Sequence, residues 1–506
     1  MPFLLENITV VAAWLVVAVL IAIALIVASA LLRRRMRARY FMRLDAERAK
    51  AQPVLQGLFQ NKIPYEKAVA DLRNRGDSYR QLAIQELILT ATADPATMAV
   101  SRRLCEDLGY VERWITTMGK AKPRRRNGKP SGGFAQRVQL WWDMALAILP
   151  GHYGFLARAL AAENLGRVRV QRAVPTLLAA LDDPHADVRN VAIRSLGQIR
   201  EVSSLPSLLR VLEEVVQAQQ EVSLRTIKSA LVQFPLNAVG QFEARLHHPH
   251  QRIRFFATDV IREIVEREIQ GGHDFVAQRD FSPGVYKAFV EQLWKDGFAD
   301  VRARAAVVVA QFMEMRGSQI LTGLLEDPQW FVRLHTVRAL SKPFYQPVLP
   351  RMARCLQDPH WMVREAAVRA MESFGAAGVS QLLDSLLATE DNYAREQIME
   401  ELQRGGLMPS IIEQLDGPAP EKAIEVLQLF VSLRKTSLIQ NALETHRTPT
   451  VRLTLAGILA AAIDEEVLET LQAVAKTDPA PMVREAAADS AQRVAARLRK
   501  LREARA

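Results

Sequence analysis

The stretch from Asp358 to Gly375, DPHWMVREAAVRAMESFG, is a unit that the chain repeats, and this repetition constrains the fold most. Pro359 cannot continue a preceding helix, and Asp358 can cap the helix that follows. Similar segments begin at three other aspartates: DPHADVRNVAIRSLG at Asp183, DPQWFVRLHTVRAL at Asp327 and DPAPMVREAAADSA at Asp478. The helix carries a narrow apolar face made of Val363, Ala366, Ala367 and Ala370. Such a face packs well only against a neighbouring copy, so the pattern predicts an all-α solenoid.

The arginine of this unit returns at a nearly constant interval. Steps of 31 residues separate Arg158 from Arg189 and join Arg302, Arg333, Arg364 and Arg395, and Arg484 follows Arg452 by 32. Arg225, Arg254 and Lys422 fill the remaining positions. Several units also start their first helix with proline, which costs nothing at the first helical turn, as at Pro175, Pro206 and Pro350. We therefore assign residues 134–506 to a solenoid of two-helix units.

This pattern resembles the HEAT repeat, in the short form seen in phycobilisome lyases and many bacterial proteins. The Asp-Pro turn, the Val-Arg pair that follows it, and the alanine face ending in Leu-Gly carry the resemblance. It implies that aspartates and arginines of neighbouring repeats form a hydrogen-bonded ladder, here Asp183/Arg189, Asp327/Arg333, Asp358/Arg364 and Asp478/Arg484. His248 and Thr448 replace the aspartate before Arg254 and Arg452, so the sequence leaves the ladder open at these two places.

The run from Ile8 to Leu32 contains no charged residue and is long enough to cross a bilayer, which takes roughly 20 apolar residues. A cleaved signal peptide is the alternative, because Ala28-Ser29-Ala30 resembles a cleavage site. The absence of a basic segment before the run and the arginines after it favour a retained transmembrane helix over residues 8–32.

Charge predicts the orientation of this helix. Residues 1–7 carry one ionisable side chain, Glu6, whereas arginines follow the run at once. Basic residues stay on the cytoplasmic side, so we expect a single pass through the inner membrane, with the N-terminus outside and the solenoid in the cytoplasm. The arginines that could also bind anionic lipid are Arg33, Arg34, Arg35, Arg37 and Arg39.

Two segments separate the predicted span from the solenoid. Residues 33–118 form a basic juxtamembrane stretch followed by an irregular helical segment, and we assign no chemistry to the segment from Leu44 to Met118. Residues 119–133, GKAKPRRRNGKPSGG, lack acidic and large apolar side chains and are expected to form a loop. The loop is either a solvated connection or a site for anionic lipid or an acidic partner, through Lys120, Lys122, Arg124, Arg125, Arg126 and Lys129. With an anchor upstream, nucleic acid is the less favoured ligand.

Large apolar side chains stand out where the repeat does not require them. Trp330 and Trp361 occupy the same position of consecutive units, three residues before the arginine. The structural interpretation is that each tryptophan packs between adjacent turns and holds them together. The functional interpretation is that these side chains form an edge that binds an apolar partner or stacks on sugar rings. That edge would comprise Trp330, Phe331, Trp361, Met362 and Tyr393.

The sequence offers no motif for catalysis, cofactor binding or metal binding. Walker-type, G-x-G-x-x-G, G-x-S-x-G and H-E-x-x-H patterns are absent, and the histidines of HHPH at 247–250 lack the partners that complete a zinc site. Cys105 and Cys355 form no disulfide framework, which fits a reducing compartment. We therefore expect neither cofactor nor metal and no enzymatic activity.

These features lead to a membrane-anchored scaffold that binds a protein partner. The formal net charge of +11 suggests an anionic neighbour without identifying it. The layout resembles bacterial envelope proteins that accompany membrane glycosyltransferases in polysaccharide export. Two alternatives stay open: an enzyme of the bilin-lyase or alkyl-base DNA glycosylase type, which would need an aromatic-lined pocket with a carboxylate, and nucleic-acid binding through residues 119–133.

Overall fold

The computed structural model describes residues 2–73, 77–119, 154–218, 221–388, 392–404, 406–418 and 420–505. Every regular element in these ranges is a helix. The chain divides into two compact units, Met1–Pro235 and Leu236–Ala506. All-helical architecture with paired helices agrees with the predicted solenoid class.

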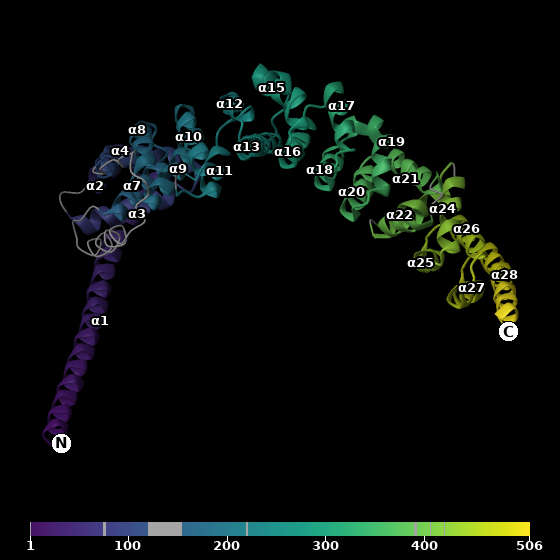
Figure 1. Cartoon of the computed structure of the whole chain (residues 1–506), viewed down its shortest axis with the longest axis horizontal. Coiled ribbons are helices and arrows are strands. Elements are labelled where there is room, and N and C mark those ends of the chain that lie inside the picture. Colours follow the sequence, from purple (N-terminus) through teal and green to yellow (C-terminus); the bar gives the residue numbers. More distant parts are fainter. Residues whose placement is uncertain are drawn as a thin grey trace. The chain divides into compact units, whose positions relative to one another are not determined.

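The N-terminal unit begins with one long helix and continues with helical pairs (Figure 1). Its α-helices are α1 (Pro2–Phe59), α2 (Tyr65–Leu72), α3 (Ser78–Ala91), α4 (Pro95–Asp107), α5 (Tyr110–Met118), α7 (Phe155–Val168), α8 (Val174–Ala179), α9 (Ala186–Ile199), α10 (Leu205–Val216) and α11 (Leu224–Leu231). Short 3-10 helices join some of them: η1 (Gln171–Ala173), η2 (Ala180–Asp182) and η3 (Val202–Ser204).

The C-terminal unit contains the remaining helices. Its α-helices are α12 (Glu243–Leu246), α13 (Gln251–Gln270), α14 (Ala277–Asp280), α15 (Pro283–Glu291), α16 (Ala299–Val309), α17 (Met315–Leu324), α18 (Trp330–Ala339), α19 (Leu349–Met352), α20 (Trp361–Glu372), α21 (Ala376–Ala388), α22 (Asn392–Arg404), α23 (Met408–Glu413), α24 (Glu421–Ser432), α25 (Ser437–Thr445), α26 (Pro449–Leu459), α27 (Glu465–Thr477) and α28 (Pro481–Arg505). The 3-10 helices are η4 (Leu236–Phe242), η5 (Leu293–Lys295), η6 (Pro343–Val348), η7 (Ala353–Gln357) and η8 (Gln414–Asp416).

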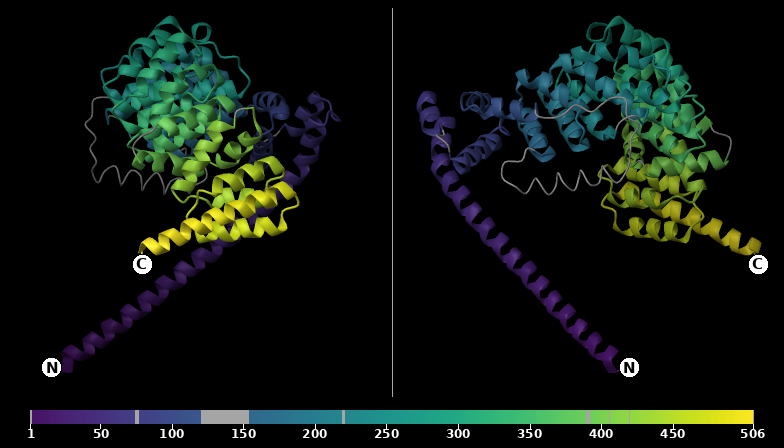
Figure 2. Two further views of the ribbon diagram at one scale, coloured as in Figure 1. Left: turned by 90° about the vertical axis from the view of Figure 1, so that its right-hand side faces the viewer. Right: turned by 60° about the vertical axis from the view of Figure 1, so that its left-hand side comes forward.

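Helix α1 runs without a break through the predicted span and the arginines that follow it. Its C-terminal half packs on α2 and α3 and buries Leu44, Ala51, Leu55 and Leu58. Figure 2 shows that its first half extends well beyond the helices against which the second half packs.

Within the side chains that the structure describes, no helix is both long enough and apolar enough to cross a membrane. Most side chains of residues 8–32, where we predict the span, lie outside that set. The anchor therefore stays a prediction.

The helices before residue 119 pack directly on the first repeat after it. Helix α5 lies against α7, Arg102 Nε donates to the Val168 carbonyl oxygen at 3.1 Å, and Arg172 pairs with Glu112 at 2.7 Å. Helices α3, α4 and α5 are thus in contact with the solenoid. The predicted loop, apart from Gly119, lies outside the described residues.

Each repeat pairs a first helix with a second helix, and the second helices form a row. In the C-terminal unit this row is α13, α16, α18, α20 and α22, each packed on the next. Figure 1 shows α16, α18 and α20 on one side of the unit and α15, α17 and α19 on the other. The prolines predicted to start first helices stand in the first turns of α8, α10 and α19.

Small side chains let neighbouring second helices approach closely. In α20 the predicted face is buried throughout, because Val363, Ala366, Ala367 and Ala370 are at most 6% exposed. Gly375 has a φ of +61°, a left-handed conformation that glycine adopts without strain, and it ends the helical segment as expected. One local prediction was wrong: the residue that caps α20 is His360, and Asp358 closes the preceding turn by accepting the His360 N–H at 2.9 Å.

Candidate functional site

The arginines that recur along the chain bind both their own turn and the next repeat. Arg333 donates from Nη1 to the Asp327 carbonyl oxygen at 2.7 Å, which fixes the turn that starts its own helix. Its Nε and Nη2 donate to the two carboxylate oxygens of Asp358, at 2.5 and 2.8 Å. A guanidinium fork matches a carboxylate in this two-bond geometry. Consecutive repeats are thereby joined at their Asp-Pro turns.

The described residues contain five such forks, each reaching forward to the next repeat. They are Arg158–Asp183, Arg254–Asp296, Arg302–Asp327, Arg333–Asp358 and Arg452–Asp478. The arginine of a turn and the aspartate six residues before it, which we named together as ladder residues, meet instead through the aspartate carbonyl oxygen, as in Arg189–Asp183, Arg364–Asp358 and Arg484–Asp478. The carboxylate of each such aspartate instead binds the arginine of the preceding repeat, as Asp358 binds Arg333.

Burial makes these pairs internal to the stack. The side chains of Arg452 and Asp478 are 7% and 5% exposed. Hydrogen bonding to Arg452 holds the pKa of the Asp478 carboxyl below its usual range, against the opposing effect of burial. Arg452 and Asp478 therefore serve to join adjacent repeats.

Histidine takes the place of the aspartate in two turns. His248 Nδ1 accepts the His250 N–H at 3.0 Å, and His446 Nδ1 accepts the Thr448 N–H at 3.1 Å, as aspartate does elsewhere. Our assignment of Thr448 to this place was wrong, because Arg452 donates to the His446 carbonyl oxygen at 2.6 Å and Thr448 caps α26. At the same junction Lys422 occupies the arginine position and pairs with Asp384 at 2.6 Å.

The aromatic side chains form a short stack along the turns. The Trp330 and His360 rings are parallel, with centroids 3.8 Å apart, and Trp361 lies beside His360 at 6.4 Å. Trp330 is partly buried, whereas Trp361 is 47% exposed. Phe331 contacts Trp330 edge-on, Met362 is partly buried, and the Tyr393 side chain lies outside the described residues. Trp330 thus fastens two turns, and Trp361 presents its ring to solvent.

A second aromatic ring stacks on a histidine, and the sequence did not lead us to predict this pair. Phe155 stacks on His185 with centroids 3.7 Å apart. Phe155 and Trp330 both stand three residues before a ladder arginine, and His185 and His360 both follow an Asp-Pro pair. Comparing these two positions across repeats would have revealed the pairing.

The predicted lipid-binding arginines are only partly described. Arg34, Arg35 and Arg39 are exposed on α1, and the side chains of Arg33 and Arg37 lie outside the described set. Lys120, Lys122, Arg124, Arg125, Arg126 and Lys129 also lie outside it. Their ligand stays a prediction.

A polar chain crosses three second helices. Asp259 on α13 is buried and accepts Arg304 of α16 at 2.9 Å, and Arg304 Nη1 lies 3.4 Å from His335 Nε2 on α18. Burial lowers the pKa of His335 to about 4, and Arg304, Arg338 and Arg262 lower it further. Positive charge therefore accumulates on the row at α16 and α18.

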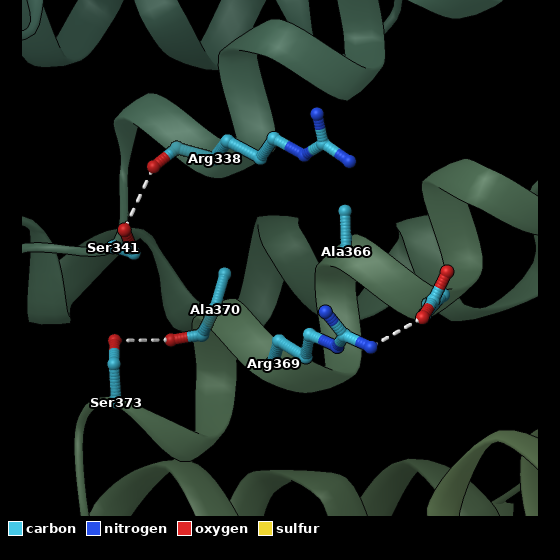
Figure 3. Close-up of a pocket in the computed structure, with 7 residues that line it drawn as sticks. Arg338, Ser341, Ala366, Arg369, Ala370 and Ser373 are labelled. Atoms are coloured by element: carbon cyan, nitrogen blue, oxygen red, sulfur yellow. Dashed lines mark hydrogen bonds and ion pairs between the residues drawn. The ribbon is translucent and has the colours of Figure 1, made fainter. Parts of the chain in front are cut away.

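Beside this chain, a hollow of about 190 Å³ opens between α18 and α20 (Figure 3). Arg338 stretches along one side of it, facing Ala366, and Arg369 folds toward Glu365, with Nη2 2.6 Å from Oε1. The Ser341 and Ser373 hydroxyls donate to the carbonyl oxygens of Arg338 and Ala370, so their oxygens can accept further bonds. Its lining consists of Arg338, Ser341, Glu365, Ala366, Arg369, Ala370 and Ser373. The aromatic pocket that the enzyme alternatives require is a different kind of site.

Within the described ranges, no three His, Cys, Asp or Glu side chains gather as metal ligands would. Cys105 and Cys355 are buried free thiols, and burial raises the pKa of each to about 12. A thiol with so high a pKa is a poor nucleophile at neutral pH.

Comparison with known proteins identifies the repeats. The family model for HEAT repeats matches residues 146–227 and 344–403, one stretch in each unit. A comparison with curated proteins finds no match. The solved structures that are similar include YibA of E. coli, which is 18% identical, with 55% of this chain and 99% of YibA covered and a TM-score of 0.29.

Two further similar structures are a lyase complex and a karyopherin. The complex of CpcE and CpcF of phycocyanin lyase from Nostoc sp. PCC7120 is 15% identical, covers 68% of this chain and 95% of that chain, and has a TM-score of 0.21. Kap121p, a karyopherin, is 13% identical, with coverage of 88% and 57% and a TM-score of 0.32. The described residues are all-helical, and two stretches of the chain match the family model for HEAT repeats.

Proposed function

We propose that this chain is a membrane-anchored scaffold whose HEAT repeats bind a protein partner on the cytoplasmic side of the inner membrane. The layout of an anchor followed by repeats favours a membrane protein as that partner, such as a glycosyltransferase of a polysaccharide-export system. The mechanism is binding and placement: the repeats hold the partner, and the anchor keeps the encounter at the membrane.

The exposed ring of Trp361 is the observation that carries the binding proposal. Trp330 has the same position in the preceding repeat, yet its ring is stacked on His360, whereas the Trp361 ring is 47% exposed. A tryptophan offers about 200 Å² of surface, so roughly 100 Å² remains available at this ring. At about 25 cal/mol per Å², covering it would contribute about 2.5 kcal/mol, the size of an interface hot spot.

The anchor proposal is supported by length and charge. A helix rises about 1.5 Å per residue, so residues 8–32 would extend about 38 Å, more than the roughly 30 Å hydrocarbon core. Helix α1 is continuous through this run and carries the arginines directly after it. A single pass with the repeats in the cytoplasm follows from the positive-inside rule.

Co-purification from membranes tests the binding proposal. Full-length tagged chain would be cross-linked in cells, solubilised in detergent and captured, and the wild type compared with Trp361→Ala. Met482→Ala is the matched control, because Met482 is also a large exposed side chain in the first turn of a second helix, 53% exposed on α28. We expect Trp361→Ala to lose a specific partner that Met482→Ala retains. Equal recovery in all three samples would refute the role of Trp361.

Alkaline extraction of the same membranes tests the anchor. A spanning helix stays in the pellet, while a peripheral chain is released. Protease added to intact spheroplasts should leave the repeats uncut if they face the cytoplasm, and cleavage from outside would reverse the proposed orientation.

A further inference from the structure

The hollow between α18 and α20 combines free donors with acceptors in a way that fits a particular ligand. Among the described residues, no ion-pair or hydrogen-bond partner lies at the guanidinium of Arg338, which is exposed. Arg369 is held by Glu365, but its side chain is still 66% exposed. Two guanidinium groups therefore border one cavity, and within the described ranges only that of Arg369 pairs with a carboxylate.

We infer that this hollow binds an acidic side chain of an extended peptide segment of the partner protein. The inference rests on the proposed scaffold function and specifies the chemistry of the partner. Arg338 would hold the incoming carboxylate through its fork, and Arg369 would be the second donor when it turns away from Glu365. Such charge-assisted pairs are stronger than neutral hydrogen bonds.

Charge complementarity on this part of the row supports an anionic ligand. Arg304, Arg338 and Arg369 stand on α16, α18 and α20, and the pKa of His335 is lowered partly by the first two. His335 remains neutral at neutral pH, so the positive charge here comes from the arginines. The hollow is also large enough, since about 190 Å³ equals roughly six water volumes of about 30 Å³ each.

The lining favours a peptide over a phosphodiester. Glu365 bonds to Arg369 at 2.6 Å, which shows the geometry that an external carboxylate would reproduce. The oxygens of Ser341 and Ser373 are left as acceptors, because their hydrogens are used by backbone carbonyls. A peptide supplies backbone N–H groups to such acceptors, whereas a phosphodiester has only acceptors on its backbone.

Fluorescence anisotropy with labelled hexaglutamate tests the inference on the full-length chain in detergent at low ionic strength. We expect saturable binding that Arg338→Gln weakens by about tenfold, the effect of about 1.4 kcal/mol. Arg194→Gln is the matched control: Arg194 is exposed on α9 and, like Arg338, stands five residues after a ladder arginine. It removes the same charge away from the hollow and should leave binding within about twofold.

A second variant distinguishes a role of the hollow from loss of folding. Glu365→Gln removes the internal competitor of Arg369 and should tighten hexaglutamate binding by about threefold, a gain that lost folding cannot produce. Equal losses from Arg338→Gln and Arg194→Gln, or tighter binding of a thymidine hexanucleotide than of hexaglutamate, would overturn the inference.

The partner experiment separates this inference from the proposed function. If a partner depends on Trp361 but is captured equally by Arg338→Gln, the hollow is not its contact and the inference fails while the scaffold stands. If wild type captures no specific partner, the scaffold proposal fails, and hexaglutamate binding then reports only on the hollow as an anion site.

Discussion

Replacing Arg333 with leucine should destabilise two adjacent repeats and leave distant ones intact. The change removes the fork to Asp358 and the bond to the Asp327 carbonyl oxygen. Asp358 would keep one donor, the His360 N–H at 2.9 Å, for a carboxylate that is 5% exposed. Leaving one member of a buried pair without its partner costs about 3–5 kcal/mol, and we expect about 3 kcal/mol because the site lies near the surface.

Hydrogen exchange measured by mass spectrometry resolves this effect better than global unfolding. Repeat proteins are stabilised by contacts between neighbours, so the loss should concentrate in α18 and α20. A loss of about 3 kcal/mol speeds exchange through local opening by roughly two orders of magnitude. Peptides from α26 and α28, in the same unit, should exchange as in the wild type.

A matched arginine provides the control. Arg351 pairs with Glu326 at 4.0 Å, and both side chains are more than half exposed, so Arg351→Leu should change protection by less than about 0.5 kcal/mol. In a double-mutant cycle with Asp358→Asn, the two losses should fall short of additivity by about 1–3 kcal/mol. Additive effects, or a loss spread evenly over the unit, would refute the forward-reaching fork as the joint between repeats.

Three further predictions concern single junctions. Lys422→Arg with His446→Asp should increase exchange protection of α24 and α26 by about 1 kcal/mol, because the pair rebuilds the fork, and neither single variant should do so. Trp330→Ala should lower protection at the α18–α20 turns by about 1–3 kcal/mol through loss of the His360 stack, whereas Trp361→Ala should change it by less than about 1 kcal/mol. Burial lowers the pKa of His335 to about 4, so between this value and about 6.5 the unfolded chain binds a proton that the folded chain does not. The contribution of neutral His335 to the stability of the fold is therefore fully present above about pH 6.5 and is lost as the pH falls through 4. Urea unfolding followed by circular dichroism should show that decline, and His335→Asn should flatten it; an unchanged slope would contradict this explanation.

Periodicity was enough to predict the helical repeats and the buried small-residue face. The recurrence of arginine at steps of 31 or 32 residues placed the ladder arginines of α9, α18, α20 and α28, because a repeated position in a solenoid has a repeated environment. The direction of the Asp358 carboxylate could not be predicted in the same way. Asp358 has one ladder arginine 25 residues before it, Arg333, and another six residues after it, Arg364. Only the packing of one turn on the next decides which of them its carboxylate binds.

Departures from the repeat were harder to interpret. Asp296 binds Arg254 as the other ladder aspartates bind their arginines, but no proline follows it to mark the turn. Helix α13 and the segment after it also increase the sequence separation of this pair to 42 residues, compared with 25 for a pair such as Arg302 and Asp327. His446 was overlooked because we took Thr448, four residues before Arg452, for a position that lies six residues before each ladder arginine. The Nδ1 atom of His446 accepts the same kind of bond as the aspartates do. The hollow could not be foreseen, since it depends on Ala366 and Ala370 leaving space between Arg338 and Arg369.

Photo-cross-linking in intact cells tests the central claim most directly. A photoreactive amino acid would replace Trp361, Arg338 or Met482 in the full-length chain, one position at a time, and the adducts would be sought in the membrane fraction. The scaffold account predicts one specific membrane-protein adduct from position 361 and none from position 482. The same adduct from position 338 is expected if the hollow also contacts that partner. The absence of an adduct at 361, or identical nonspecific patterns from all three positions, would contradict it.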